Sequence, residues 1–212
     1  MQHKKQSIRI LLTIMLAIIL MPMQVHAEGD IYIGYVIRSW ENGRVVEKNA
    51  TIHGSQFAWM TDNHTHMHNG WWYTRDCNVT IEDQVQVDEG ATANIILING
   101  TTMTFKEGIY VPANSTLNIY GQAGDTGVLY CHTDDNCSAG IGGREDDPCG
   151  TINIYGGTID AKGDDNTGGS AEGGAGIGGG DEVSGGTIRI YGGNITARGA
   201  TDAAGIGGGD DG

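Results

Sequence analysis

The chain has 212 residues, of which 26 are Asp or Glu and 12 are Lys or Arg, so its formal net charge is −14 at pH 7. An acidic surface repels phosphate backbones and anionic lipids, which argues against nucleic acid and anionic membranes as partners. The same charge suits a solvated extracellular protein and leaves carboxylates available for Ca²⁺, although solubility alone is enough to explain it.

Residues 1–27 have the organisation of a secretory signal peptide. A positive start, an apolar stretch and a cleavage signal follow one another in Lys4, Lys5 and Arg9, in residues 10–20 and in Val25-His26-Ala27. A transmembrane anchor is the alternative, but the apolar stretch is about half of the ~20 residues that a membrane span needs. We therefore expect a secreted or cell-surface protein that does not insert into the membrane once the signal is removed.

Residues 28–70 do not follow the pattern of the remaining chain. Residues 31–36 and 45–52 could form strands. We expect this segment to be an N-terminal cap, because an open stack of strands exposes unpaired edges.

From residue 71 to 212, pairs of apolar residues alternate with polar ones, and turn residues separate the pairs. Each pair predicts a short strand with one face buried. Between residues 79 and 119 the pairs are Val79/Ile81, Val85/Val87, Ile96/Ile98, Met103/Phe105, Ile109/Val111 and Leu117/Ile119. No stretch shows the 3.6-residue period of a helix, so the sequence predicts an all-β fold.

Two short phrases recur in the second half of the chain. The first, Thr-(Leu/Ile)-x-Ile-Tyr-Gly, begins at Thr116, Thr151 and Thr187, and Ala-Gly-Ile-Gly-Gly follows each copy. A fixed period of roughly 35 residues indicates stacked units that bury their faces against their neighbours. We predict three strands per unit and repeats over about residues 116–149, 150–185 and 186–212. Because the chain stops directly after a repeat phrase, we expect a truncated chain or the start of a longer protein.

An ordered series of motifs runs through residues 70–212. It includes Gly70-Trp-Trp-Tyr73, Asn78-Val-Thr-Ile81, Ile96-Leu-Ile-Asn-Gly100, Glu107-Gly-Ile-Tyr-Val111, Gly156-Gly-Thr-Ile-Asp-Ala-Lys-Gly163 and Gly192-Gly-Asn-Ile-Thr-Ala-Arg-Gly199. This series resembles the glycine-rich parallel β-helix segments of large exported bacterial surface proteins. The resemblance implies a single-stranded right-handed parallel β-helix (β-solenoid) of the pectate-lyase-like kind. It implies a scaffold or adhesive module, although the same fold also carries polysaccharide lyases and hydrolases.

Three tyrosines form the first candidate binding site. Tyr120, Tyr155 and Tyr191 each follow an inward-pointing Ile, so they should face outward and stack in register. A strip of aromatic rings is a platform for sugar rings, which makes the three tyrosines candidate glycan-binding residues. Packing between rungs that only shields the sheet is the alternative.

Two sets of residues are candidate metal ligands. Gly-Asp turns place Asp181 with Glu182 and Asp210 with Asp211, and these carboxylates could bind Ca²⁺, with solvated loops as the alternative. The other acidic side chains of similar kind are Asp134, Asp135, Asp146 and Asp147. His64, His66 and His68 alternate, so on a strand they could share one Zn²⁺ or Cu²⁺, whereas in a polar loop they would bind none. We expect no other cofactor.

Four cysteines in an exported chain predict two disulfides, with free thiols as the alternative if the organism lives without oxygen. They are Cys77, Cys131, Cys137 and Cys149. Three pairings are possible, and the short polar loop between Cys131 and Cys137 favours that pair, which leaves Cys77 with Cys149.

These observations favour a non-catalytic module of an adhesive protein that binds a glycan or another surface protein. The tyrosine strip and the loops 134–147 and 164–173 are its expected binding sites. The alternatives are a polysaccharide lyase or glycoside hydrolase, for which Asp160 near Lys162 or Arg198 is the one assembly available, and a purely structural stalk. An enzyme should gather acidic and basic groups in a groove, whereas an adhesive module should present a flat face with regular ladders.

Overall fold

The computed structural model describes residues 32–74, 77–133, 137–164 and 173–212. The predicted signal peptide, residues 1–27, lies outside these ranges, as do parts of the loops 134–147 and 164–173. Within the described ranges the only helical element is one 3-10 turn, η1 (Gly54–Gln56). The chain is therefore all-β, as predicted.

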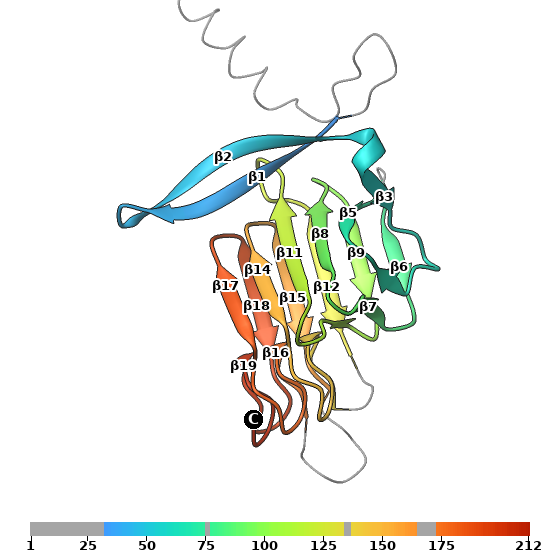
Figure 1. Ribbon diagram of the computed structural model, residues 1–212, viewed down its shortest axis with the longest axis vertical. Coiled ribbons are helices and arrows are strands. Elements are labelled where there is room, and N and C mark those ends of the chain that lie inside the picture. Colours follow the sequence, from blue (N-terminus) through green and yellow to red (C-terminus); the bar gives the residue numbers. More distant parts are fainter. Residues whose placement is uncertain (1–31, 75–76, 134–136, 165–172) are drawn as a thin grey trace, which may run out of the picture.

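Short parallel strands form three sheets, which we call sheets I, II and III (Figure 1). Sheet I contains, in spatial order, β3 (Phe57–Trp59), β5 (Gly70–Tyr73), β8 (Thr92–Leu97), β11 (Thr116–Gly121), β14 (Thr151–Ile154) and β17 (Thr187–Ile190). Sheet II contains β6 (Val79–Ile81), β9 (Thr102–Phe105), β12 (Val128–His132), β15 (Thr158–Lys162) and β18 (Asn194–Arg198). Sheet III contains β4 (His66–Met67), β7 (Val85–Val87), β10 (Ile109–Tyr110), β13 (Ile141–Gly142), β16 (Ile177–Gly178) and β19 (Ile206–Gly207).

From β5 onward the chain enters sheets I, II and III in a fixed rotation that repeats to β19. Each inner strand pairs in parallel with the strands one rotation before and after it, and Thr116, Thr151 and Thr187 are aligned across β11, β14 and β17. The three sequence repeats each contain one strand of every sheet. This arrangement is consistent with a β-helix, and equivalent residues lie about 4.8 Å apart on successive rungs.

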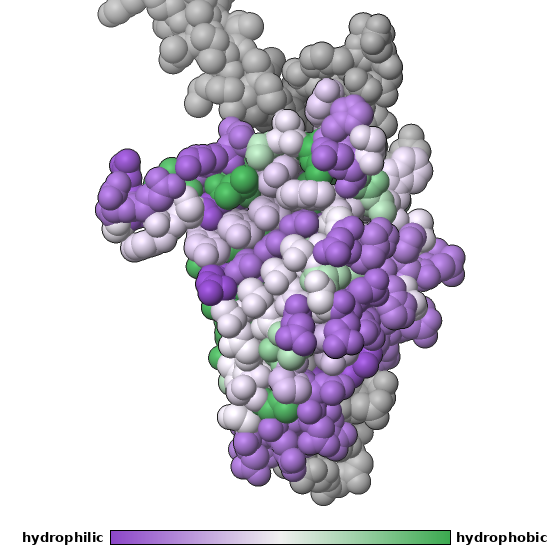
Figure 2. All heavy atoms as spheres, in the orientation of Figure 1, coloured by the Kyte–Doolittle hydropathy of each residue, from purple (hydrophilic) through white to green (hydrophobic). Residues whose placement is uncertain are grey.

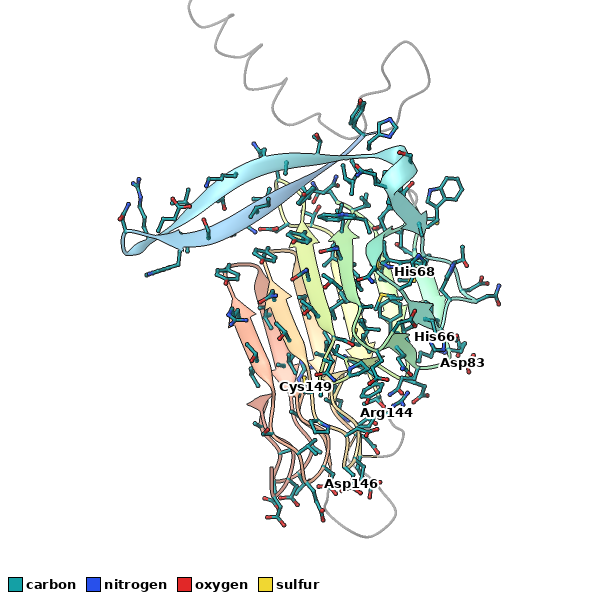
Figure 3. All side chains as sticks on the ribbon, in the orientation of Figure 1. His66, His68, Asp83, Arg144, Asp146 and Cys149 are labelled. Carbon is teal, nitrogen blue, oxygen red and sulfur yellow. The ribbon has the colours of Figure 1, made fainter. Side chains whose placement is uncertain are left out.

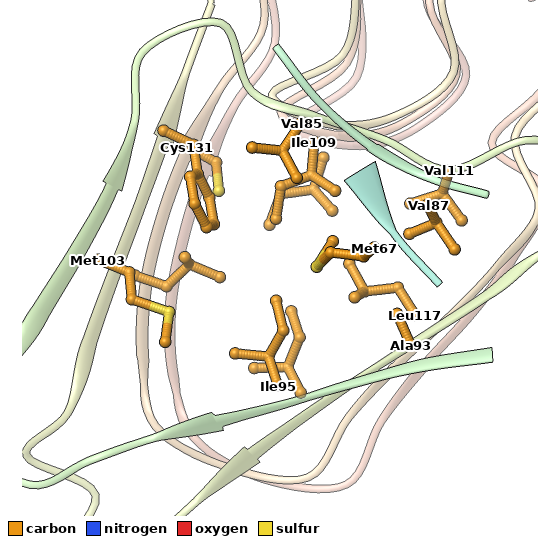
Figure 4. Close-up of a cluster of buried hydrophobic side chains, with 14 of the residues drawn as sticks. Met67, Val85, Val87, Ala93, Ile95, Met103, Ile109, Val111, Leu117 and Cys131 are labelled. Carbon is orange, nitrogen blue, oxygen red and sulfur yellow. The ribbon is translucent and has the colours of Figure 1, made fainter. Parts of the chain in front are cut away.

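The apolar core lies between the three sheets, whose side chains point toward one another (Figure 4). Leu117 and Ile119 of β11 are fully buried in it, as the alternation pattern predicts, and so are Leu129 of β12 and Ile141 of β13. Burying an aliphatic side chain of this size contributes about 1.5–3 kcal/mol, so the repeated isoleucines supply much of the stability of the stack.

One strand has a different phase from the prediction. In β8 the residues that point into the core are Ala93, Ile95 and Leu97, whereas Ile96 and Ile98 belong to a second apolar cluster. The run Ile95-Ile-Leu-Ile98 is apolar throughout, so alternation cannot assign its faces. Both faces of β8 are buried, which requires something to cover sheet I from outside.

The cover is a long antiparallel hairpin of β1 (Tyr32–Glu41) and β2 (Arg44–His53). Its two-residue turn, Asn42-Gly43, has positive φ at both positions, the geometry of a tight hairpin. Figures 1 and 2 show the hairpin lying across sheet I, with apolar residues where it meets the sheet and a hydrophilic tip. Part of the segment expected to be a cap therefore covers a sheet face. Moreover, β3 and β4 already pair within sheets I and III, before residue 71.

Glycines permit close stacking in sheet III. Gly142 and Gly178 have φ of 146° and 141°, a conformation that favours glycine. A Cβ atom at Gly142 would overlap the carbonyl oxygen of Gly178, and one at Gly178 would overlap that of Gly207. The repeated Gly-Ile-Gly phrase is therefore a packing requirement of the last three rungs, where β13, β16 and β19 stack on one another.

The last repeat is less buried than the two before it. Ile190 and Ile206, which were expected to point inward, are 44% and 45% exposed. They lie on β17 and β19, the edge strands of sheets I and III, so no further described rung covers them.

Candidate functional site

The three candidate tyrosines form a continuous stack on the outer face of sheet I. The rings of Tyr120 and Tyr155 have centroids 4.6 Å apart and lie 3° from parallel. Tyr155 and Tyr191 are 5.0 Å apart and 9° from parallel. The stack continues to Trp71 of β5, whose ring centroid lies 5.3 Å from that of Tyr120.

The hairpin covers one end of this stack. Tyr35 of β1 makes an edge contact with Tyr120 at 5.0 Å and packs on Trp71 at 4.8 Å. Tyr120 is only 9% exposed, and burial raises the pKa of its hydroxyl above the ordinary value. Tyr120 therefore belongs to an apolar interface, whereas Tyr155 and Tyr191 remain half-buried at the surface.

Arg38 of β1 fastens the hairpin over the stack. Its Nη2 lies 2.7 Å from Oδ2 of Asp125, and its Nη1 donates to the carbonyl oxygen of Tyr155 at 2.7 Å. Asp125 also accepts a hydrogen bond from the backbone N–H of Gly157. The Arg38 side chain is 11% exposed, so this contact links the hairpin directly to the backbone of the tyrosine ladder.

The four calcium candidates lie in stacked glycine-aspartate turns. The N–H of Asp181 donates to the carbonyl oxygen of Cys137, and the N–H of Glu182 donates to that of Asp210. The N–H of Asp211 donates to the side chain of Asp210. These bonds give the turns a role in the fold. In the described ranges, no three His, Cys, Asp or Glu side chains gather in a way that could hold a metal ion.

His64 and His68 share Trp72 as an aromatic neighbour, with the His64 ring centroid 5.4 Å from that of Trp72, whereas His66 has a partner of its own. Nδ1 of His64 accepts a hydrogen bond from the N–H of Thr61, and Nδ1 of His66 lies 3.0 Å from Oδ1 of Asp88. His68 packs edge-on against Trp72 with ring centroids 4.8 Å apart. Figure 3 shows His66 and His68 on the side of the molecule where β6 and β7 lie. Zinc or copper binding at this cluster stays a prediction without geometric support.

The structure differs from the prediction of two disulfides. All four cysteines are described, and none is joined to another. Cys131 points into the core beside Val85 (Figure 4), where burial raises the pKa of its thiol well above the ordinary value. Cys149 is also buried, which raises its thiol pKa to about 12, whereas Cys77 is exposed. Cys131 has the inward-facing role of Ala161, its partner in the next rung. The short polar loop between Cys131 and Cys137 therefore does not imply a disulfide between them.

Sheet II brings together the acidic and basic residues that were considered for a lyase. Nη1 of Arg198 lies 2.8 Å from Oδ1 of Asp160, and Nε2 of His132 lies 3.1 Å from the same oxygen. Lys162 is adjacent, because His132, Lys162 and Arg198 are aligned across β12, β15 and β18. Asp160 therefore bridges two basic groups on the outer face of this sheet.

A hollow of about 470 Å³ lies beside this cluster. Its lining includes Tyr130, His132, Lys106, Glu107 and Lys162. Tyr130 is 40% exposed and its ring contacts that of His132 at 6.0 Å. An aromatic face next to charged and polar groups on rigid strands has the composition of a small-ligand site.

Tyr130, His132 and Lys106 were not among the predicted site residues. Alignment of the repeats could have found two of them. Tyr130 and His132 lie on either side of the inward Cys131, at the positions that Asp160 and Lys162 occupy beside Ala161 in the next repeat. The position of Lys106 needs the register of β9, which lies outside the sequence repeats.

Among the described residues, no helix is long and apolar enough to span a membrane. Comparison of the chain with models of protein families, with curated proteins and with solved structures finds no match.

Proposed function

We propose that the three sheets are the walls of a single-stranded right-handed parallel β-helix, and that this β-helix is a non-catalytic binding module of an exported adhesive protein. The fixed rotation through the sheets and the aligned threonines support the β-helix. The resemblance of residues 70–212 to glycine-rich bacterial surface segments supports the cell-surface role, as does the signal-peptide pattern of residues 1–27.

The observation that carries the binding role is the exposed ring of Tyr130 beside the hollow on sheet II. A sugar ring can stack on such an aromatic face while its hydroxyl groups reach polar side chains at the rim. The tyrosine stack of sheet I is less suitable, because the hairpin occupies its Tyr120 end. We therefore assign glycan binding to sheet II.

A glycan array with the folded chain, residues 28–212, tests this assignment. We expect Tyr130→Ala to abolish the signals and Tyr191→Ala, its control on the outer face of sheet I, to retain them. The opposite result would return binding to the tyrosine stack. A wild-type chain that is folded but binds no glycan would favour the structural stalk or a protein partner.

A polysaccharide lyase on the same fold is the second candidate. The contacts of Asp160 with Arg198 and His132 favour it, because a lyase needs a base close to charged groups that bind an acidic sugar. Incubation with acidic polysaccharides should yield no new unsaturated ends if the module is non-catalytic. Formation of such ends would make Asp160, Lys162 and Arg198 the first residues to replace. The Ca²⁺ proposal for Asp181, Glu182, Asp210 and Asp211 is tested by repeating both assays with a chelator.

A further inference from the structure

Basic side chains form a column on the outer face of sheet II, at the C-terminal ends of its strands. His132, Lys162 and Arg198 occupy equivalent positions of β12, β15 and β18. Lys106 directly follows Phe105, the partner of Cys131 in β9, and so continues the column by one rung. The rungs of a parallel sheet are about 4.8 Å apart, so a linear molecule laid along the stack would meet one basic group per rung.

The carboxylates that pair with Arg198 and Lys106 do not use all the N–H donors of these two side chains. Arg198 has five N–H donors and pairs with Asp160, while Lys106 pairs with Glu82 at 2.8 Å. Glu107 also lines the hollow, and Asp164 follows Lys162 by two residues. In a chain whose formal net charge is −14, the column nevertheless places four basic side chains on one face, where a negatively charged ligand would meet them directly.

The aromatic ring and the basic column lie at one hollow. Tyr130 is on the same strand as His132 and one rung from Lys162, and all three line it. A sugar ring stacked on Tyr130 would place a carboxylate or sulfate within reach of the Lys162 ammonium group and the N–H groups of His132. Neutral sugars could use the ring but not the column.

We propose that the outer face of sheet II binds a linear acidic glycan, whose carboxylate or sulfate groups contact the basic column directly and without a bridging metal ion. This inference rests on the proposed binding function and narrows its ligand to one class. Because each rung adds one basic group, affinity should rise with the length of the oligosaccharide until the column is filled.

Titration of the folded chain with three oligosaccharides of equal length tests the inference: an oligouronate, a heparin-derived sulfated chain and a neutral cello-oligosaccharide. We expect the acidic chains to bind at least about tenfold more tightly than the neutral one, because several modest ionic contacts add to the stacking contact. EDTA should not change this affinity. If uronate alone or sulfate alone binds, that result identifies the source of the negative charge.

Charge-removing variants show whether acidic chains bind the column itself or respond to the overall electrostatic potential of the protein. The double variant Lys162→Gln/Arg198→Gln should weaken acidic binding by about tenfold, since exposed ionic contacts contribute modestly. Arg189→Gln is the matched control, because Arg189 is exposed on β17 of sheet I and belongs to the same repeat as Arg198. Lys106→Gln gives an independent test at the other end of the column, where the side-chain partner Glu82 is exposed.

Several outcomes would overturn the inference. Equal or tighter binding of the neutral chain would do so while leaving the glycan-binding function intact. An equal loss in Arg189→Gln would assign the preference to general electrostatics, and loss of binding in EDTA would assign it to a metal bridge. If no glycan of either kind binds the folded chain, the proposed function itself fails.

Discussion

Replacing Arg38 with Ala should release the hairpin from sheet I. The change removes the ion pair with Asp125 and the hydrogen bond to the carbonyl oxygen of Tyr155. Breaking a fully buried ion pair costs about 3–5 kcal/mol, whereas an exposed pair contributes about 0–1 kcal/mol. The side chains of Arg38 and Asp125 are 11% and 24% exposed, so an intermediate cost of about 2 kcal/mol is expected.

A cost of about 2 kcal/mol corresponds to an increase of roughly 30-fold in the fraction of molecules with an open hairpin. Hydrogen exchange of the backbone amides of β1 and β2, followed by mass spectrometry, measures this local opening separately from global unfolding. We expect faster exchange in the hairpin and little change in the inner strands β11 and β14.

Arg44→Ala is the control, because it removes the same type of side chain from the exposed end of β2 next to the turn. A double-mutant cycle of Arg38→Ala with Asp125→Ala should give a coupling energy of about 1–2 kcal/mol. If hairpin exchange is the same in Arg38→Ala and Arg44→Ala, or the coupling is near zero, Arg38 does not fasten the hairpin and this reasoning is wrong.

Three further predictions concern the close stacking of the rungs and the cysteine thiols. Gly178→Ala should lower the free energy of unfolding by about 2–4 kcal/mol, since it combines a positive φ with a clash against the next rung. Gly34→Ala, where a Cβ atom has room, should change it by less than about 0.5 kcal/mol, and equal losses in urea titrations would contradict the close-stacking argument. In the folded protein a thiol reagent at pH 8 should modify Cys77 and spare Cys131 and Cys149, whose thiol pKa values burial raises. Protection of Cys77 that a reductant reverses would instead support a disulfide. Because the Cys149 thiol ionises near its ordinary pKa of about 8.5 when unfolded and at about 12 when folded, its contribution to stability is full below pH ~8.5 and is lost as the pH rises toward 12.

The all-β fold could be predicted from the sequence because the repeats record local alternation. The inward positions of Leu117 and Ile119 follow from a two-residue period, and the repeats align their equivalents without any long-range information. Hydrophobic alternation cannot assign the faces of a strand where every residue is apolar. In the apolar run 95–98 both phases are equally hydrophobic, and only the hairpin above sheet I explains why the outward side is also apolar.

The position of the hairpin could not be predicted from local patterns. Its key contacts join residues far apart in the chain, such as Arg38 with the carbonyl of Tyr155, and no periodic signal links them. The sequence predicts strands at residues 31–36 and 45–52, which overlap β1 and β2, but it cannot say which surface they cover. For that reason the sequence predicts an end cap and a binding site at the tyrosine strip, but not the contact of Arg38 with the carbonyl of Tyr155 that connects the two.

The candidate site changed because one sheet face is covered and another is not. Tyr120 and Tyr130 occupy outward positions of β11 and β12, which are consecutive in the chain but belong to different sheets. The sequence favours Tyr120 as a binding residue because Tyr155 and Tyr191 repeat it. Repetition, however, is what cross-rung stacking requires, and the 4.6 Å spacing and near-parallel rings of Tyr120 and Tyr155 fulfil that role. Tyr130 has no equivalent in the next rung, where Asp160 takes its place. In a repetitive fold, the residue that breaks a column while staying exposed is therefore the better candidate for binding, because packing of the stack does not account for it.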